Sequence, residues 1–248
     1  MYDVLVKNGK IVTADAVFDG NIAVKNGKIA ALMSAGEEPE AAKVIDAKGN
    51  YVFPGAIDTH AHLNDPGYEW REDYEHGTAA AALGGYTTVI DMPLQNEPAM
   101  TNADLFDKKV EKVDSNAYAD YCFWGGLIPD NFEDLKGMHD KGCVAFKSFI
   151  GPVSPDYSSL NYGQAYEAMQ RIKEFGGRAG FHCEDFSMIK WQEARMKKRR
   201  PPGLAGISGF QAGDRRNGCY RGYDRDCQGY WMQSPYLSCQ QPGCGSED

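Results

Sequence analysis

Two histidines separated by one residue are the first candidates for chemistry in this sequence. His60 and His62 follow the apolar run of residues 51–57, within YVFPGAIDTHAHLNDPG. If the run is a strand, its side chains alternate between faces, so the two imidazoles point the same way. Two imidazoles on one face, where a strand opens into a loop, suit one metal ion. Two polar residues leaving a strand would give the same pattern, so the pair alone leaves both interpretations open.

A lysine and a third histidine stand in comparable places further along the chain. Lys147 lies inside the apolar segment CVAFKSFI, where a charged ammonium group is costly. It either pairs with a buried carboxylate, lies on an exposed strand face, or has a pKa lowered by burial and nearby cations. In the last case the neutral amine reacts with CO₂ to form a carbamate, an anionic ligand able to bridge two metal ions. His182, in FHCED, would by itself more often be a satisfied core histidine, and the other three residues strengthen its candidacy as a ligand.

These residues fall in a region where predicted strands and helices alternate. Such βα repeats predict parallel strands joined by right-handed crossovers. Polar residues gather after the strands, at the end where a (β/α)₈ barrel places its active site. The alternation would also fit an open doubly wound sheet. We expect strands at 51–57, 86–91, 118–124, 143–150 and 178–183, and helices at 74–83, 102–113, 131–141 and 164–175.

The first fifty residues have a different pattern. The hexapeptide VKNGKI occurs at residues 6–11 and again at 24–29, and each Asn-Gly is flanked by alternating apolar residues. This is a strong signal for a β-hairpin, so we expect two hairpins in a small antiparallel sheet, with Val44 and Ile45 adding a strand. Nothing in this region carries chemistry, and we interpret it as a structural β subdomain.

Composition limits the class of protein. The chain has 248 residues and a formal net charge of −9, which argues against a nucleic-acid partner. No apolar run approaches the roughly 20 residues that a membrane-spanning helix needs, so no membrane partner is expected. The N-terminal sequence MYDVLVKNGK has no signal-peptide pattern, and we therefore expect a cytoplasmic protein.

The chain resembles the amidohydrolase superfamily, and within it the cyclic-amide hydrolases: allantoinase, dihydroorotase and hydantoinase. The resemblance covers residues 1 to about 198 and rests on KNGKIVT, PGAIDTHAHLNDPG, GGYTTVIDMP, FKSFI and HCE. It implies a (β/α)₈ TIM-type barrel preceded by a small β-sandwich subdomain. It also implies two divalent metal ions, with zinc expected, bridged by N-carboxylated Lys147. By position, His60 and His62 would bind the more buried ion and His182 the second. Full-length members are usually homotetramers.

The resemblance also implies a reaction, the opening of a small cyclic ureide or amide by a metal-activated hydroxide. Dihydroorotases carry an arginine two residues after the second histidine, where this chain has Asn64, and they read MPN where it has MPL at 92–94. The segments HLNDPG, DMPL and YCFWGGLIPDN look most like allantoinase, which converts allantoin to allantoate. Asn64 is therefore a candidate substrate contact, although a turn-forming asparagine is an equal alternative.

The last fifty residues depart from the family. Residues 199–248 hold only three residues of the Ile, Leu and Val set, no lysine and no periodic pattern. We infer a reading-frame shift near residues 198–203, because the frame one base later can encode a family-like segment. A genuine Gly/Arg/Cys-rich tail is the alternative.

The expected domains are therefore a β subdomain at 1–50, five βα units of an incomplete barrel at 51–198, and a disordered, out-of-frame tail at 199–248. The family's sixth-strand histidine and its general-base aspartate are absent from this chain, so we expect the chain as given to be inactive. A dihydropyrimidinase, hydantoinase or dihydroorotase-type activity is the alternative reaction, and a non-catalytic scaffold is the alternative class. The ring substrate and its chirality, the metal and the oligomeric state stay open.

Overall fold

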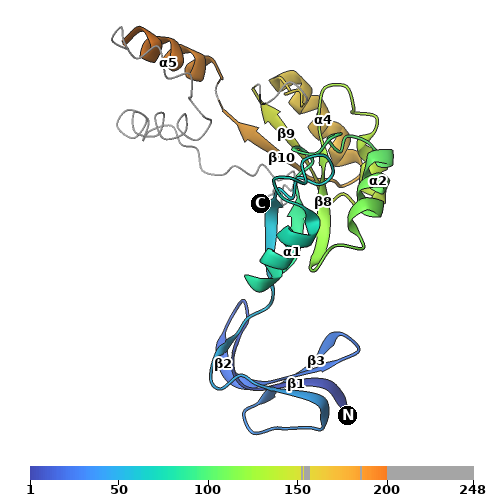
Figure 1. Ribbon diagram of the computed structural model, residues 1–248, viewed down its shortest axis with the longest axis vertical. Coiled ribbons are helices and arrows are strands. Elements are labelled where there is room, and N and C mark those ends of the chain that lie inside the picture. The colour runs from blue at the N-terminus through green and yellow to red at the C-terminus, as the bar shows by residue number, and fades with distance from the viewer. Residues whose placement is uncertain (152, 154–156, 185, 200–248) are drawn as a thin grey trace, which may run out of the picture. The chain divides into compact units, whose positions relative to one another are not determined.

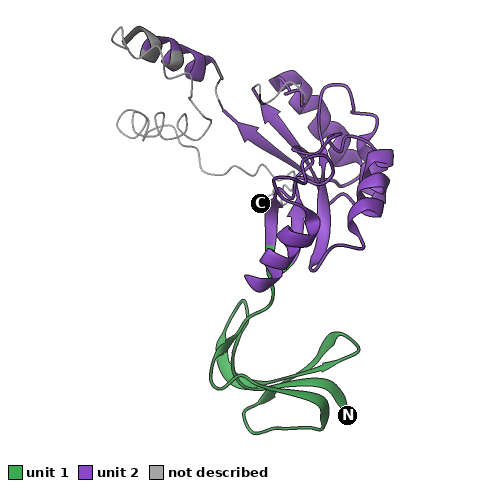
Figure 2. Cartoon of the chain, in the orientation of Figure 1, with its two compact units in different colours: residues 1–57, 85–87 green, residues 58–84, 88–248 purple. Residues whose placement is uncertain are grey.

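The computed structural model describes residues 1–151, 153, 157–184 and 186–199 (Figure 1). Apart from residue 199, the segment that we interpret as out of frame lies outside the described residues. Unit 1 comprises Met1–Ile57 with Gly85–Thr87, and unit 2 comprises Asp58–Gly84 with the described residues from Thr88 onward (Figure 2). Each unit has its own sheet, and each is described by itself.

Unit 1 is built on one mixed sheet in the order β3-β2-β1-β4, with β5 also paired to β1. The pairs β1–β2 and β2–β3 are antiparallel, whereas β4 and β5 run parallel to β1. The expected β subdomain is thus present, but its sheet is mixed rather than purely antiparallel. The strands are β1 (Tyr2–Val12), β2 (Val17–Lys25), β3 (Lys28–Ser34), β4 (Ala41–Asp46) and β5 (Tyr51–Val52).

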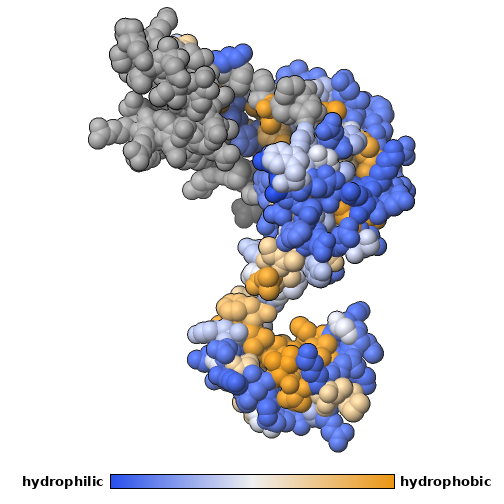
Figure 3. All heavy atoms as spheres, in the orientation of Figure 1, coloured by the Kyte–Doolittle hydropathy of each residue, from blue (hydrophilic) through white to orange (hydrophobic). Residues whose placement is uncertain are grey.

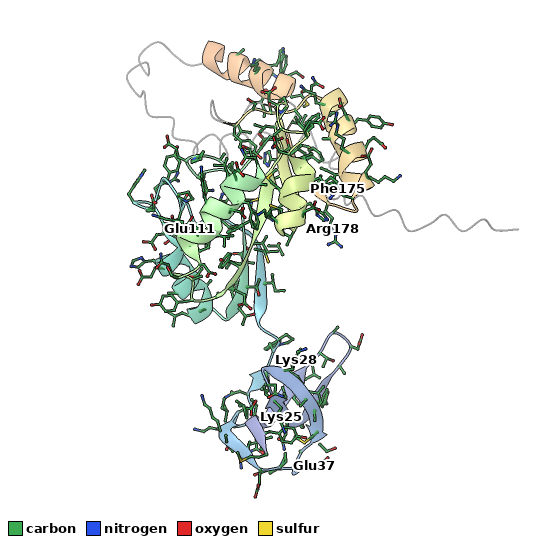
Figure 4. All side chains as sticks on the ribbon, turned by 90° about the vertical axis from the view of Figure 1, so that its right-hand side faces the viewer. Lys25, Lys28, Glu37, Glu111, Phe175 and Arg178 are labelled. Atoms are coloured by element: carbon green, nitrogen blue, oxygen red, sulfur yellow. The ribbon has the colours of Figure 1, made fainter. Side chains whose placement is uncertain are left out.

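Only one of the two expected Asn-Gly hairpins forms. Asn26 and Gly27 have φ angles of 52° and 70° and join β2 to β3, as a tight hairpin turn requires (Figure 4, between Lys25 and Lys28). The prediction was wrong for the first copy, where β1 continues through Asn8-Gly9 with a register shift against β2. Asn8 takes a positive φ of 57° there, and its backbone N–H donates to the side chain of Asn21, so the motif forms a bulge.

Unit 2 is an incomplete (β/α)₈ barrel, which confirms the expected fold class (Figure 1). Its sheet has the order β10-β9-β8-β7-β6, so strands that follow one another in sequence are neighbours in space. The pairs β7–β8, β8–β9 and β9–β10 are parallel, and a helix connects each strand to the next. The strands are β6 (Ala56–Ala61), β7 (Tyr86–Asp91), β8 (Asp120–Gly126), β9 (Ala145–Ile150) and β10 (Ala179–Cys183).

Capping residues set the starts of three helices. Asp73, Asn102 and Asn161 each accept a hydrogen bond from a first-turn backbone N–H, and Asn161 forms a full capping box with Gln164. A fifth helix follows β10 and completes the fifth βα unit, although the sequence pattern gave no bounds for this helix. The helices are α1 (Tyr74–Leu83), α2 (Ala103–Val113), α3 (Leu135–Lys141), α4 (Tyr162–Glu174) and α5 (Phe186–Arg199).

The core of unit 2 lies between the sheet and helices α2 to α4. Phe123 of β8 and Phe146 of β9 pack in it with Phe106, Met138 and Ile172 of the helices. Phe175, the C-cap of α4, lies against Phe146 and against the ring of His139, which gives His139 a packing role (Figure 4).

Unit 1 leaves much apolar surface uncovered by the described residues (Figure 3). The exposed large apolar residues of unit 1 include Val17, Phe18, Ile29, Leu32, Val44, Ile45, Tyr51 and Phe53.

None of the described helices is both long and apolar enough to cross a bilayer.

Candidate metal centre

The two clustered histidines lie at the carboxyl end of β6. His60 is within the strand and His62 follows directly after it, with their ring centroids 5.3 Å apart. Within the strand, the backbone N–H of His60 donates to the Asp58 side chain at 3.0 Å. The Nδ1 atom of His62 is buried and has no hydrogen-bond partner within the described part of the chain. The pair thus presents two neighbouring imidazoles, one of them with an unused buried nitrogen.

Lys147 and His182 share a face of the sheet at its other edge. In the β9–β10 register Lys147 faces Gly180, and Phe149 faces His182. The Lys147 Nζ lies 4.9 Å from the centroid of the Phe149 ring, which is 5.5 Å from the His182 ring. The Lys147 side chain is only 7% exposed, and none of the described carboxylates pairs with its amine. Burial lowers the pKa of Lys147, as is needed for an amine that reacts in its neutral form.

Curling of the sheet brings its two edges toward each other. A flat sheet would place β6 and β10 about 19 Å apart, four strand spacings of about 4.8 Å. Burial lowers the pKa of His60, and the positive charges of Lys147 and His182 are close enough to lower it further. Burial also lowers the pKa of His62, against the opposing charge of Asp91. Both imidazoles are thereby favoured in the neutral, ligating form.

The donors fit a metal centre only in part. Within the described ranges, no three His, Cys, Asp or Glu side chains come close enough to form a ready-made site. The structure therefore brings together the His60–His62 pair and places Lys147 near His182. Imidazole nitrogens are common ligands of transition metals, and the described residues offer them as one close pair and one separate histidine beside a buried amine.

Asn64 lies beside the histidine pair but is turned inward. It is 7% exposed, and its Nδ2 donates to the carbonyl of His62 at 3.2 Å. Its Oδ1 is buried without a partner among the residues described. Its φ of 53° is in the left-handed region, which asparagine tolerates in turns. The geometry gives Asn64 a turn-forming role, and substrate contact stays a prediction.

A buried charged pair adjoins the centre and was not expected from the sequence. Asp91 ends β7 and is fully buried, and Lys109 of α2 is 2% exposed, with Nζ 2.5 Å from the Asp91 Oδ2. One feature of the sequence could have predicted that Lys109 is buried. Lys109 falls three residues after Phe106 and four before Val113, which places it on the apolar stripe of the helix.

Trp124 of β8 contacts both β6 and β10. Its indole N–H donates to the Thr59 carbonyl of β6 at 3.0 Å. A Cβ added to Gly180 of β10 would lie 2.9 Å from the Trp124 ring. The tryptophan therefore joins β6 to β10, and Gly180 provides the space for its ring.

The sequence and the fold both match known proteins. Residues 51–150 match the amidohydrolase family. The chain is 34% identical to an L-hydantoinase of Paenarthrobacter aurescens over 199 residues, 79% of this chain and 43% of the relative. It is 36% identical to an allantoinase of Bacillus velezensis over 194 residues, 78% of this chain and 42% of the relative.

Solved structures agree with these matches. The L-hydantoinase (dihydropyrimidinase) from Arthrobacter aurescens superposes with a TM-score of 0.77 at 31% identity, covering 89% of this chain and 49% of that one. A D-hydantoinase gives a TM-score of 0.66 at 32% identity, covering 82% and 45%. The chain thus spans less than half the length of the relatives that it matches.

Proposed function

Because the chain belongs to the amidohydrolase family, as a cyclic amidohydrolase of allantoinase-like sequence, we propose that the whole protein hydrolyses a C–N bond of a cyclic amide. The observation that carries the proposal is the placement of four nitrogen donors. His60 and His62 lie at the end of β6, and Lys147 and His182 lie on one face of β9 and β10, with the sheet curled between them.

The residues divide the work of holding two divalent cations. His60 and His62 would hold one ion, His182 the other, and Lys147, as a carbamate, would lie between them. When bound, the ions, with zinc as the first candidate, supply a water nucleophile of lowered pKa and a Lewis acid for the amide carbonyl. Burial lowers the pKa values of both histidines of the pair and of Lys147, which favours the neutral, ligand-forming state of each. No residue of this chain is assigned as the general base.

Allantoin is the substrate that we propose, and a hydantoin or dihydropyrimidine is the second candidate. The allantoinase relative supports the first, and the L-hydantoinase relative at similar identity supports the second. Asn64, in place of the arginine expected in a dihydroorotase, makes dihydroorotate a weaker candidate.

Metal analysis of the 248-residue chain tests the centre. The purified protein is loaded with Zn²⁺ in bicarbonate buffer, desalted and assayed for bound metal. We expect His60→Ala/His62→Ala to lose most of the bound metal. His76→Ala/His139→Ala is the matched control, since both histidines lie on helices outside the centre. Equal metal content in the two double variants would contradict the proposed centre.

A substrate screen tests the reaction. The coding DNA is read first, and if a one-base shift restores family-like sequence after residue 198, the corrected chain is assayed beside the chain as given. The substrates are allantoin, hydantoin, dihydrouracil and dihydroorotate. We expect allantoate from the corrected chain and none from the 248-residue chain. Normal allantoate release by the latter would refute the inactivity that we propose, and no hydrolysis of any ring by either would refute the function.

A further inference from the structure

The Asp91–Lys109 pair is linked to the segment that carries the histidines. The Asp91 Oδ1 accepts the backbone N–H of Leu63, the residue after His62, at 3.0 Å. The backbone N–H of Met92, the residue after Asp91, donates to the carbonyl of Ala61, the residue before His62, at 2.9 Å. The end of β7 thus holds the chain on both sides of His62.

The second carboxylate oxygen of Asp91, Oδ2, bonds to side chains of two helices. The Asp91 Oδ2 accepts from Lys109 of α2 at 2.5 Å and from the hydroxyl of Tyr74, the first residue of α1, at 3.1 Å. Lys109 also donates to Asn96 Oδ1 at 2.8 Å, and the Asn96 amide donates to the carbonyls of Met92 and Leu94. The loops after β6 and β7 are therefore tied to one buried charge pair.

The charges in this network are well compensated. Besides its two oxygen partners, the Lys109 ammonium lies 4.9 Å from the centroid of the Phe123 ring and 5.7 Å from that of Tyr74. Burying an ion pair costs desolvation that its own attraction often fails to repay, so such a pair is weak evidence for stability alone. Fully satisfied buried networks do fix a single geometry of the groups that they bind.

We propose that Asp91 is a positioning residue for the metal centre: with its charge balanced by Lys109, it fixes the backbone at Leu63 and so aims the His62 imidazole. The inference rests on the proposed function, because it assigns His62 to a metal ion. Partners that orient metal ligands typically contribute about 10- to 100-fold to metal affinity. Asp91 acts here on the ligand's backbone rather than on its ring.

Two double variants isolate the hydrogen bond to Leu63. Asp91→Asn/Lys109→Met removes the charge pair but leaves a side-chain oxygen to accept the Leu63 N–H. Asp91→Leu/Lys109→Met removes the same charges in nearly the same shape and leaves no acceptor. Lys141→Met, which breaks the exposed pair with Asp107, is the control for losing a lysine. Zn²⁺ affinity is measured by competition with a chromophoric chelator, and amide exchange at Leu63 is measured on the metal-free chain.

We expect the leucine variant to bind Zn²⁺ about tenfold or more weakly than the asparagine variant, and its Leu63 amide to exchange faster. Equal affinities together with equal exchange would overturn the proposal. If the wild-type 248-residue chain binds no Zn²⁺, the proposed metal centre fails for this chain; Leu63 exchange and the sharpness of the His62 ring signals in the metal-free variants then decide the positioning role. Should the leucine variant not fold, Tyr74→Phe removes another bond to Asp91 but spares Leu63. A loss of affinity in Tyr74→Phe with no faster exchange at Leu63 would also overturn the proposal.

Discussion

Lys147 is the most costly residue of the candidate centre before any metal binds. Its amine is buried on the concave side of the sheet, and no described carboxylate balances its charge. A buried, unpaired charge destabilises the folded state, and the lowered pKa of Lys147 expresses the same cost. A residue that destabilises the folded state is expected where function requires it.

We predict that Lys147→Met stabilises the metal-free chain at pH 7 by about 1 kcal/mol, because methionine fills similar space without a charge. Chemical denaturation measures the change. The same variant should lose the bridging ligand and bind less Zn²⁺. Lys25→Met, on the exposed end of β2, is the control and should leave both quantities unchanged. A less stable Lys147→Met chain would show that the amine has a stabilising partner.

The histidine pair predicts a pH dependence of stability. The pKa values of His60 and His62 are lowered in the folded state, so the unfolded chain binds protons more readily. Their contribution is therefore fully present above the unfolded pKa of about 6.5 and is lost as pH falls through the lower folded values. We expect the metal-free chain to lose stability below pH 6.5 and His60→Asn/His62→Asn to flatten that loss. An unchanged pH profile in the variant would contradict this.

At the scale of elements, packing against Trp124 explains why residue 180 is a glycine. A Cβ on residue 180 would meet the rim of an indole whose N–H is already bonded to Thr59, so the ring has little freedom to move. We predict that Gly180→Ala destabilises unit 2 by about 1–3 kcal/mol. Adding Trp124→Phe, a smaller ring, should recover part of the loss, as thermal unfolding would show. Equal destabilisation in the single and double variants would place the strain elsewhere.

Local signals predicted most elements of unit 2 well. Asn102 was expected to cap α2 and does so, and α1 and β7 begin and end where the alanine-rich and β-branched runs do. Two failures have physical causes. Asn8-Gly9 has the same local sequence as Asn26-Gly27, but contacts with Asn21 and β5 turn it into a bulge. The buried Lys109 was missed because its partner, Asp91, lies on another element.

At the scale of the whole molecule, the family resemblance and the incomplete barrel were predictable because both follow from patterns along the chain. The strand order of unit 2 simply repeats the sequence order. The distance between the edges of the sheet was not predictable, because curling is a collective property of five strands. His60, His62, Lys147 and His182 could therefore be named from the sequence as one candidate set, whereas the distances between them required the structure.

Metal binding should stabilise the whole chain by mass action. A ligand that binds only the folded state at 100 times its dissociation constant adds about 2.7 kcal/mol. We expect Zn²⁺ to raise the thermal midpoint and a chelator to reverse the shift. His60→Ala/His62→Ala should show neither effect. An equal shift in that variant would assign the stabilisation to ions bound elsewhere.

The placement of the donors on opposite edges of one sheet has a consequence for folding kinetics. His60 lies in the first strand of the sheet, His62 directly follows that strand, and His182 lies in the last strand. The full donor set therefore meets only after every intervening strand has paired. We predict that a metal ion finds its complete site only after the transition state of folding, which folding and unfolding rates measured with and without Zn²⁺ would check. Interactions absent from the transition state slow unfolding and leave the folding rate nearly unchanged. A bound ion would therefore slow unfolding of the incomplete barrel and lengthen the lifetime of the native state, while leaving the folding rate nearly unchanged.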